Sequence, residues 1–422
     1  MSIIIVLIIS VISFNVEAFE FRFTQETDLP SPSPTFFENK NSCPKSFSEI
    51  KGVEYYDIDN PVKDVSSTDF SALTKLEDDI DRNSLLKAIS ENIEYWEVKP
   101  ESFYAKIGKD SYSKSKMLKA NKRLYEIFSS SMSLSEILNV LKKEFNIYKA
   151  VSDETNDVTI TGYYESEIAV KREKDDIYKY PLHLKPPDLV KVNGMDFDYG
   201  RYDENGNLVK YYSTEEIRKG EIDKFNIEIA YSNHPAEIML AQIQGSSILR
   251  FLDGDYARIG FDGANGWKFV SVQKILMDCG EIPSMNFKSF IKYLSSQPQD
   301  REERLVNLNP RYIFFTIKDK DSSPQGAISK DLVSGRSVAI DPAYIPYGFV
   351  AYISSTKPVS DENGETIIEF KRFSRFIVTH DTGSAIRGAG RIDLFWGSGK
   401  KAELEASSMK ANGSFYIFAP KN

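Results

Sequence analysis

The sequence contains few of the side chains that bind metals: two cysteines and three histidines among 422 residues. Cys43 and Cys279 are too far apart in the sequence to form a zinc-binding pair, and the histidines, His183, His234 and His380, lack metal-ligand spacing. We therefore predict no metal and no cofactor. An oxidising compartment would permit a disulfide between the two cysteines, but their separation in sequence does not show whether they come within reach.

Positive charge is also in deficit, since 53 Lys and Arg residues face 62 Asp and Glu residues and the net charge is −9. This balance argues against nucleic acid or an anionic membrane surface as the main partner and favours an uncharged or mixed-charge polymer. The 41% of apolar residues suffices for a full core. A chain of this length predicts two domains.

Long apolar runs are missing apart from one at residues 2–16, which is shorter than a bilayer-spanning helix. Small residues at Val16 and Ala18 fit the positions that a signal peptidase reads, so we expect residues 1–18 to be a signal peptide and the protein to be exported. Because Met1-Ser2 carries no basic residue, an uncleaved anchor is the alternative. No cysteine follows the run to accept a lipid.

Residues 69–150 show helical periodicity after a Pro-rich lead-in. Apolar residues recur every three to four positions over 85–96 and over 137–145, which predicts two amphipathic helices. Ser133 and Glu136 have the spacing of a capping box for the second helix. We interpret these helices as a scaffold.

At residues 157–164 the hydrophobic period falls to two, which predicts a strand. Two sets of residues alternate along it: Val158, Ile160 and Gly162 on one face, and Thr159, Thr161 and Tyr163 on the other. Gly162 would let a sugar ring approach the backbone, and Tyr163 and Tyr164 would offer flat apolar faces with polar tips. A barrel rim explains the same residues equally well.

Residues 166–322 carry short strand-like runs separated by turn signals, which predicts a small antiparallel barrel with short helices at 271–277 and 286–294. We expect Gln242 and Gln244 to lie on one face of a strand. Their amides would suit sugar hydroxyls and N-acetyl groups, and a cross-strand amide pair is the structural alternative.

The stretch 379–397 places two carboxylates twelve residues apart. Asp381 follows a β-branched strand at a tight turn, and Asp393 lies on a second short strand, on the face opposite Ile392 and Leu394. A carboxyl desolvated in such a strand has a raised pKa, as a general acid requires. The alternative is that both aspartates only cap turns.

Several of these segments together resemble the membrane-bound lytic murein transglycosylase A family. Asp381 and Asp393, with Asp341 in a third motif upstream, match the three aspartates for which the family's "3D" domain is named. Five segments carry the resemblance in order: 161–165, 242–246, 335–342, 381–388 and 391–397.

The resemblance implies a mainly β fold with N-terminal helices. A double-psi β-barrel, domain A, would be built from both chain ends, 19–165 and 323–422. A second small β-barrel, domain B, would be inserted at 166–322, with the substrate groove between the two.

The resemblance also implies cleavage of the bond between N-acetylmuramic acid and N-acetylglucosamine in peptidoglycan without water, leaving 1,6-anhydro ends. Asp393 matches the catalytic acid/base of this exotransglycosylase. We expect a periplasmic monomer that acts on glycan strands, and association with the outer membrane is left open. The residues expected to bind substrate are Asp381, Asp341, Thr382, Gly383, Gln242, Gln244, Gly162, Tyr163 and Tyr164.

Two other functions fit the same residues. A water-using endoglycosidase would employ Asp393 as acid and Asp381 or Asp341 as base, whereas a wall protein without turnover would use the aspartates as sugar ligands. Ser384, Arg387 and His380 depart from the usual family residues. For His380 we favour a structural hydrogen bond over a catalytic part.

Overall fold

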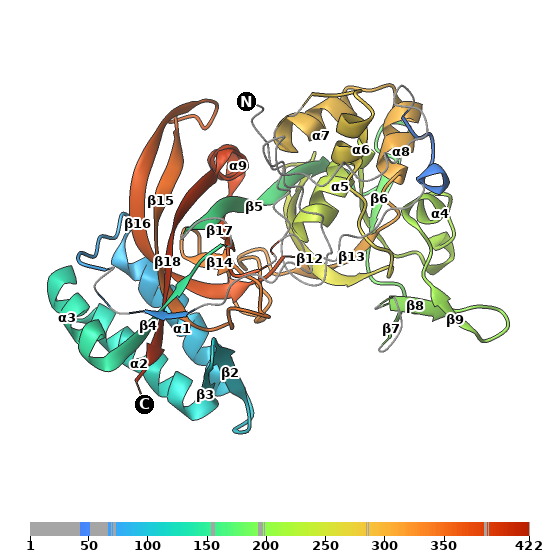
Figure 1. Ribbon diagram of the computed structural model, residues 1–422. Helices are drawn as coiled ribbons and strands as arrows, with labels where there is room; N and C mark the ends of the chain where they lie inside the picture. Colours follow the sequence, from blue (N-terminus) through green and yellow to red (C-terminus); the bar gives the residue numbers. More distant parts are fainter. Residues whose placement is uncertain are drawn as a thin grey trace, which may run out of the picture. The chain divides into compact units, whose positions relative to one another are not determined.

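The computed structural model describes residues 43–50, 66–68, 70, 73–152, 157–192, 197, 199–283, 285, 287–383, 386 and 388–421. The expected signal peptide and Pro-rich lead-in lie outside this part of the chain. The described residues form two compact units, coloured by sequence in Figure 1. The barrel unit contains 66–165 and 323–421, and the insert unit contains 43–50 and 166–322.

A closed barrel forms the centre of the barrel unit. Its strands follow the order β18-β15-β16-β14-β17-β5, and β5 pairs again with β18, which closes a ring of six strands within the described residues. The prediction of a barrel drawn from both sides of an insertion is confirmed. The strands are β5 (Val158–Val170), β14 (Ser337–Ala339), β15 (Val350–Ser360), β16 (Ile367–Asp381), β17 (Arg391–Ser398) and β18 (Lys410–Pro420).

Alternation of apolar residues along these strands fills the barrel. Ile160 on β5 and Ile392 and Leu394 on β17 are fully buried in one cluster, as the period of two predicts. β4 (Phe145–Ala150) extends the sheet from β18, and β1 (Ser66–Thr68) pairs with β4. Helix α9 (Gly399–Ser408) packs against β17 and β15.

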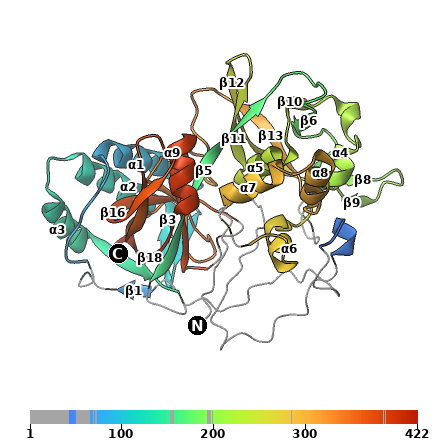
Figure 2. The ribbon, with the colours of Figure 1, turned by 90° about the horizontal axis from the view of Figure 1, so that it is seen from above.

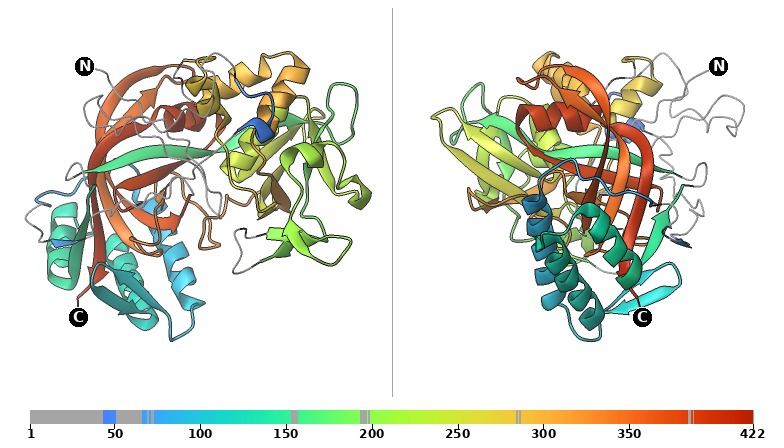
Figure 3. Two further views of the ribbon diagram at one scale, coloured as in Figure 1. Left: turned by 45° about the vertical axis from the view of Figure 1, so that its right-hand side comes forward. Right: turned by 90° about the vertical axis from the view of Figure 1, so that its left-hand side faces the viewer.

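Three helices, α1 (Arg82–Glu97), α2 (Lys114–Ser129) and α3 (Leu134–Glu144), complete the barrel unit. Figures 2 and 3 show α1 and α2 side by side, and α1 contacts β16 while α2 contacts β18. The predicted capping box is present at the start of α3. Between α1 and α2 lies a hairpin of β2 (Tyr104–Ile107) and β3 (Asp110–Ser113).

Buried ion pairs tie the segment before α1 to the barrel. Arg336 has no exposed side-chain surface and donates to Asp78, at 2.8 Å. Arg375 donates through two nitrogens to Asp79, each at 2.7 Å. Because both arginines are buried, removing either partner would leave an uncompensated charge inside the protein.

The insert unit combines helices with a ring of strands, as the predicted small barrel requires, but the strands are not all antiparallel, so that part of the prediction was wrong. The end of β5 pairs in parallel with β11 (Ser246–Phe251), and β12 (Tyr256–Ala264) and β13 (Ile313–Lys318) continue that sheet. β6 (Tyr180–His183) pairs with β10 (Glu228–Ser232). Single bridges join this pair to both edges of the sheet, Tyr231 to Lys171 after β5 and Leu184 after β6 to Phe315 on β13, which closes a ring of strands. A separate small sheet consists of β7 (Val190–Lys191), β8 (Tyr199–Tyr202) and β9 (Leu208–Lys210).

Helices account for the rest of the insert unit. The predicted short helices are confirmed as α6 (Val272–Asp278) and α7 (Phe287–Ser295), and α4 (Thr214–Arg218) and α8 (Gln299–Asn307) were not predicted. α5 (Pro235–Gln244) contacts α7 and α8, as Figure 2 also shows. The described residues contain no helix with the length and hydropathy needed to cross a membrane.

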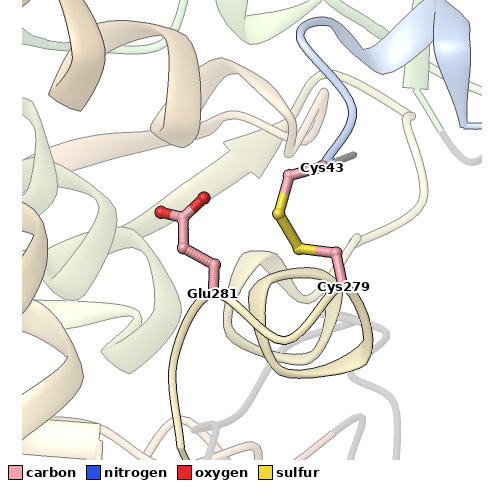
Figure 4. Close-up of side chains that lie close together, drawn as sticks. All are labelled: Cys43, Cys279 and Glu281. Carbon is pink, nitrogen blue, oxygen red and sulfur yellow. A yellow bond between two sulfur atoms is a disulfide. The ribbon is translucent and has the colours of Figure 1, made fainter. Parts of the chain in front are cut away.

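Residues 43–50 belong to the insert unit, which corrects their assignment to domain A. Cys43 and Cys279 form a disulfide across 236 residues of sequence, with their Cα atoms 5.3 Å apart (Figure 4). Phe47 packs edge-on against Trp267, with ring centroids 5.8 Å apart. The sequence left open whether the two cysteines pair, and in the structure they form a disulfide.

Candidate active site

Asp393 lies on the outer face of the barrel. Ile392 and Leu394 point into the barrel core, and alternation turns Asp393 the other way, as predicted. The strand register places Asp381 opposite the same residue of β14 as Asp393. Ala339 on β14 pairs with Asp393 on one side and with Asp381 on the other. Two aspartates twelve residues apart in sequence therefore flank one residue of a shared neighbouring strand.

A chain of hydrogen bonds ends on Asp393. Thr161, its register partner on β5, donates its hydroxyl to Oδ1 of Asp393 at 2.6 Å. Nη2 of Arg391 donates to the same hydroxyl at 2.9 Å. Since the hydroxyl accepts from Arg391, its single proton is directed at Asp393, and Oδ1 is held as an acceptor.

The other oxygen of Asp393 has a different environment. Oδ2 is buried and meets no hydrogen-bond partner among the described residues. Burial raises the pKa of Asp393 to about 6, against the lowering effects of the Arg391 charge and the Thr161 hydrogen bond. The carboxyl is thus suited to carry a proton, and Oδ2 is the oxygen on which to carry it.

Asp381 is held by more donors than Asp393. Its Oδ1 accepts from the backbone N–H groups of Ala327 and Thr382, each at 2.9 Å, and its Oδ2 accepts from the Tyr163 hydroxyl at 3.0 Å. Three donors on one carboxylate hold it in a fixed position.

Asp341 caps a turn in a similar way. Oδ1 accepts from the backbone N–H of Ala343 at 3.0 Å, and Oδ2 accepts from that of Gly388 at 2.7 Å. The turn-capping alternative, drawn from the sequence for Asp381 and Asp393, therefore describes Asp381 but not Asp393, and Asp341 caps a turn as well. Thr382 supports the same turns by donating its hydroxyl to the carbonyl of Ile340 at 2.8 Å.

The aromatic residues of β5 are not open platforms. Tyr163 is fully buried and packs against Phe395, and Tyr164 is only 4% exposed. Trp396, rather than an open space, lies over Gly162: a Cβ on this glycine would come within 2.5 Å of the indole nitrogen. In this structure, Tyr163 therefore supports Asp381, and Gly162 makes room for Trp396.

Gln242 and Gln244 do not lie on a strand, so that prediction was wrong. Both are in the last turn of α5, which begins with Pro235 and ends at Gly245 in the left-handed conformation (φ 72°). This helix is buried on nearly every side, and a short run that is mostly apolar cannot be told from a strand by periodicity. Gln242 donates to the carbonyl of Ile313 at 3.4 Å, and the amide of Gln244 meets no partner among the described residues.

Gly383 accepts a backbone hydrogen bond from Ile386, while residues 384, 385 and 387 lie outside the described part of this loop. His380 points away from Asp381. Its ring nitrogens contact Ser337 and Asn92, and burial lowers its pKa to about 3, so it is neutral. The expected structural hydrogen bond is therefore present.

Sequence reasoning assigned no role to Thr161 or Arg391. The signal was available for Thr161, since the alternation of β5 placed it on one face with Tyr163. The alternation within β5 could not show which strand lies beside it, because local periodicity does not determine the register between strands that are distant in sequence.

Known proteins share both parts of this architecture. A family described as the MltA specific insert domain matches residues 159–316, and one described as the 3D domain matches residues 336–419. The chain belongs to the MltA family. Membrane-bound lytic murein transglycosylase A of Escherichia coli K12 is 28% identical over 271 residues, which cover 63% of this chain and 67% of the relative. The Vibrio cholerae protein of that name is 26% identical over 274 residues, 64% of this chain and 67% of the relative.

Solved structures share the fold at lower identity. A membrane-bound lytic murein transglycosylase from Agrobacterium tumefaciens is 23% identical, with a TM-score of 0.68 over 85% of this chain and 98% of that one. E. coli MltA with bound chitohexaose is 20% identical, with a TM-score of 0.62 over 85% of this chain and 95% of that one.

Proposed function

We propose that the protein is a peptidoglycan lytic exotransglycosylase that uses Asp393 as its single acid and base. The observation that carries this proposal is the contrast among the three aspartates. Asp393 alone is buried with an oxygen free of partners among the described residues, whereas Asp341 and Asp381 are occupied by backbone donors.

The reaction begins with Asp393 protonated on Oδ2. This proton passes to the glycosidic oxygen between N-acetylmuramic acid and N-acetylglucosamine as the bond from that oxygen to C1 breaks. The carboxylate of Asp393 then takes the proton of the C6 hydroxyl of the muramic acid residue, whose oxygen attacks C1 and closes a 1,6-anhydro ring. The enzyme returns to its starting protonation state, and no water is consumed.

The surroundings of Asp393 suit both halves of this cycle. A pKa near 6 leaves a usable fraction protonated at neutral pH and still gives a carboxylate able to accept a proton. Thr161 and Arg391 keep Oδ1 as the acceptor, so the proton is confined to Oδ2. The nucleophile belongs to the substrate, and proximity therefore replaces the activation of water.

A water-using glycosidase would need a second carboxylate as base, or as nucleophile at about 5 to 5.5 Å from the first. Asp381 and Asp341 are poor candidates, because both oxygens of each already accept hydrogen bonds. We assign these two aspartates, with Thr382 and Gly383, to shaping the substrate site. The double-psi topology of the barrel belongs to the same proposal.

The expected partner is the glycan strand of peptidoglycan, consistent with the chitohexaose bound to E. coli MltA. The expected location is the cell envelope, on the periplasmic side, since the relatives carry "membrane-bound" in their names. The remaining predicted substrate residues, Gln242, Gln244, Gly162, Tyr163 and Tyr164, stay predictions; their burial makes an indirect role more compatible with this structure.

Digestion of purified peptidoglycan with analysis of the soluble muropeptides by mass spectrometry tests the proposal. We expect anhydro-muramyl ends, lighter by one water than hydrolysed ends. Reducing muramyl ends would instead establish the water-using endoglycosidase, and intact peptidoglycan with retained binding would establish the non-catalytic wall protein.

A further inference from the structure

Two groups of side chains among the described residues are arranged as metal ligands could be: Cys43 with Cys279 and Glu281, and His183 with Asp223 and Glu228. In the first group the sulfurs form a disulfide beside Glu281 (Figure 4). Because a cysteine binds zinc only as the thiolate, this oxidised pair is not a metal site. The second group lies wholly within the insert unit and takes no part in the proposed reaction.

The fold of the insert unit brings the second group together. His183 ends β6 and pairs in register with Glu228, the first residue of β10. Asp223 begins the 3-10 turn Asp223–Phe225, just before β10. One ligand atom from each of the three residues lies within 4.8 Å of the other two.

His183 is the part of this group that the protein's own residues leave incomplete. Its side chain is 1% exposed, yet Nε2 meets no hydrogen-bond partner among the described residues. Burial of an unpaired polar atom costs roughly 1–3 kcal/mol, so such an atom calls for an explanation. A ligand bound at Nε2 would supply one.

The other ring nitrogen is already used. Nδ1 lies 2.7 Å from the hydroxyl of Tyr312, which donates its proton to the carbonyl of Pro181 at 3.2 Å. With the single phenol proton on the carbonyl of Pro181, Nδ1 donates to the phenol oxygen, and Nε2 keeps its lone pair. This arrangement fixes the tautomer that binds a metal through Nε2.

The charges around His183 also suit a cation. Asp223 is exposed and Glu228 is half-buried. Neither carboxylate forms a hydrogen bond or ion pair with a described residue. The positive charge of Arg218 also acts on His183. Arg218 opposes a bound cation, but two carboxylates outnumber one guanidinium.

We propose that His183, Asp223 and Glu228 form a Zn²⁺ site in the insert unit. An imidazole nitrogen and carboxylate oxygens are ordinary zinc ligands at about 2.0–2.2 Å, which places tetrahedral donors roughly 3.3 Å apart. Side-chain rotations of the two accessible carboxylates close the remaining distance, and water completes the shell. The ion ties the turn at Asp223 to the β6–β10 hairpin, so its role is structural.

Zinc binding to the full chain, freed of metal by chelation, tests this proposal with Zn²⁺ alone as the probe. Equilibrium dialysis with metal analysis is expected to give one zinc per wild-type chain. The double variant Asp223→Asn/Glu228→Gln is expected to bind at least about 100-fold more weakly, since even loss of a group that supports a ligand costs 10–100-fold. Zinc should raise the melting temperature of the wild type and not that of the double variant.

Glu221→Gln is the matched control, because Glu221 is an exposed carboxylate just before this turn and outside the cluster. It should bind zinc as the wild type does. Failure of the wild type to bind zinc would overturn the proposal, and so would wild-type affinity in the double variant. None of these results depends on the peptidoglycan reaction.

Discussion

The barrel unit and the insert unit differ in whether certain buried polar side chains have hydrogen-bond or ion-pair partners. In the barrel unit, Arg336 and Arg375 are paired with aspartates, and His380 has a partner on each ring nitrogen. In the insert unit, Nε2 of His183 and the amide of Gln244 meet no partner among the described residues. Paired groups hold a fold together, whereas unpaired ones are costly unless something else binds them.

The barrel unit also contains buried polar atoms without a partner among the described residues, and their position is informative. Oδ2 of Asp393 and the indole nitrogen of Trp396 are buried without a partner among the described residues, and both residues belong to β17. Unpaired polar atoms therefore gather on the strand to which we assign the chemistry. The comparison predicts that disrupting a paired group costs stability, whereas changing an unpaired group costs function.

The largest expected effect is on activity. Asp393→Asn keeps the shape of the side chain but removes the proton that cleavage requires, so the rate of muropeptide release should fall by about 100-fold or more. Mass spectrometry of the digestion products measures it. Glu362→Gln, an exposed carboxamide substitution in the same unit, should leave the rate unchanged.

A paired group should behave in the opposite way. Arg336→Met leaves Asp78 buried without its partner and should lower the free energy of unfolding by about 3–5 kcal/mol. Chemical denaturation measures this loss. Lys75→Met breaks the exposed pair with Glu77 and should have no measurable effect. Equal losses in the two variants would remove the distinction between buried and exposed pairs.

The fold was predictable where a local pattern matched a local structure. Alternation placed Asp393 opposite Ile392 and Leu394, and Ser133 with Glu136 predicted the start of α3 correctly. These features depend on neighbours in sequence, and the structure preserves them.

The features that were not predicted depend on contacts between residues that are distant in sequence, which a local pattern does not show. Gln242 was placed on a strand because a short apolar run fits a buried helix equally well. The partners of Asp393 come from register between β5 and β17, which are more than two hundred residues apart. His183 and Glu228 likewise meet through the pairing of β6 with β10.

Stability should respond to pH through the unpaired carboxyl. The folded-state pKa of Asp393, about 6, exceeds the unfolded value of about 3.9, so the folded protein loses stability as pH rises between these values. An asparagine at this position cannot ionise. The variant Asp393→Asn should therefore gain about 2–3 kcal/mol over the wild type at neutral pH and little at pH about 4. Denaturation at both pH values decides this, and a pH-independent difference would contradict it.

The smallest expected effect concerns the Thr161 hydroxyl. Its hydrogen bond lowers the pKa of Asp393, so Thr161→Val should raise that pKa and extend activity to higher pH by about one unit. The charged or titratable neighbours Arg391, Tyr163 and Asp381 are unchanged in this variant. Thr159→Val, on the same face of β5, should leave the pH profile of muropeptide release where it was.

Direct titration of the Asp393 carboxyl carbon by NMR tests the central claim most closely. The account predicts a pKa of about 6 in the wild-type protein, higher in Thr161→Val. A carboxyl that titrates at its ordinary value near 4 would be ionised at neutral pH and could not serve as the proton donor.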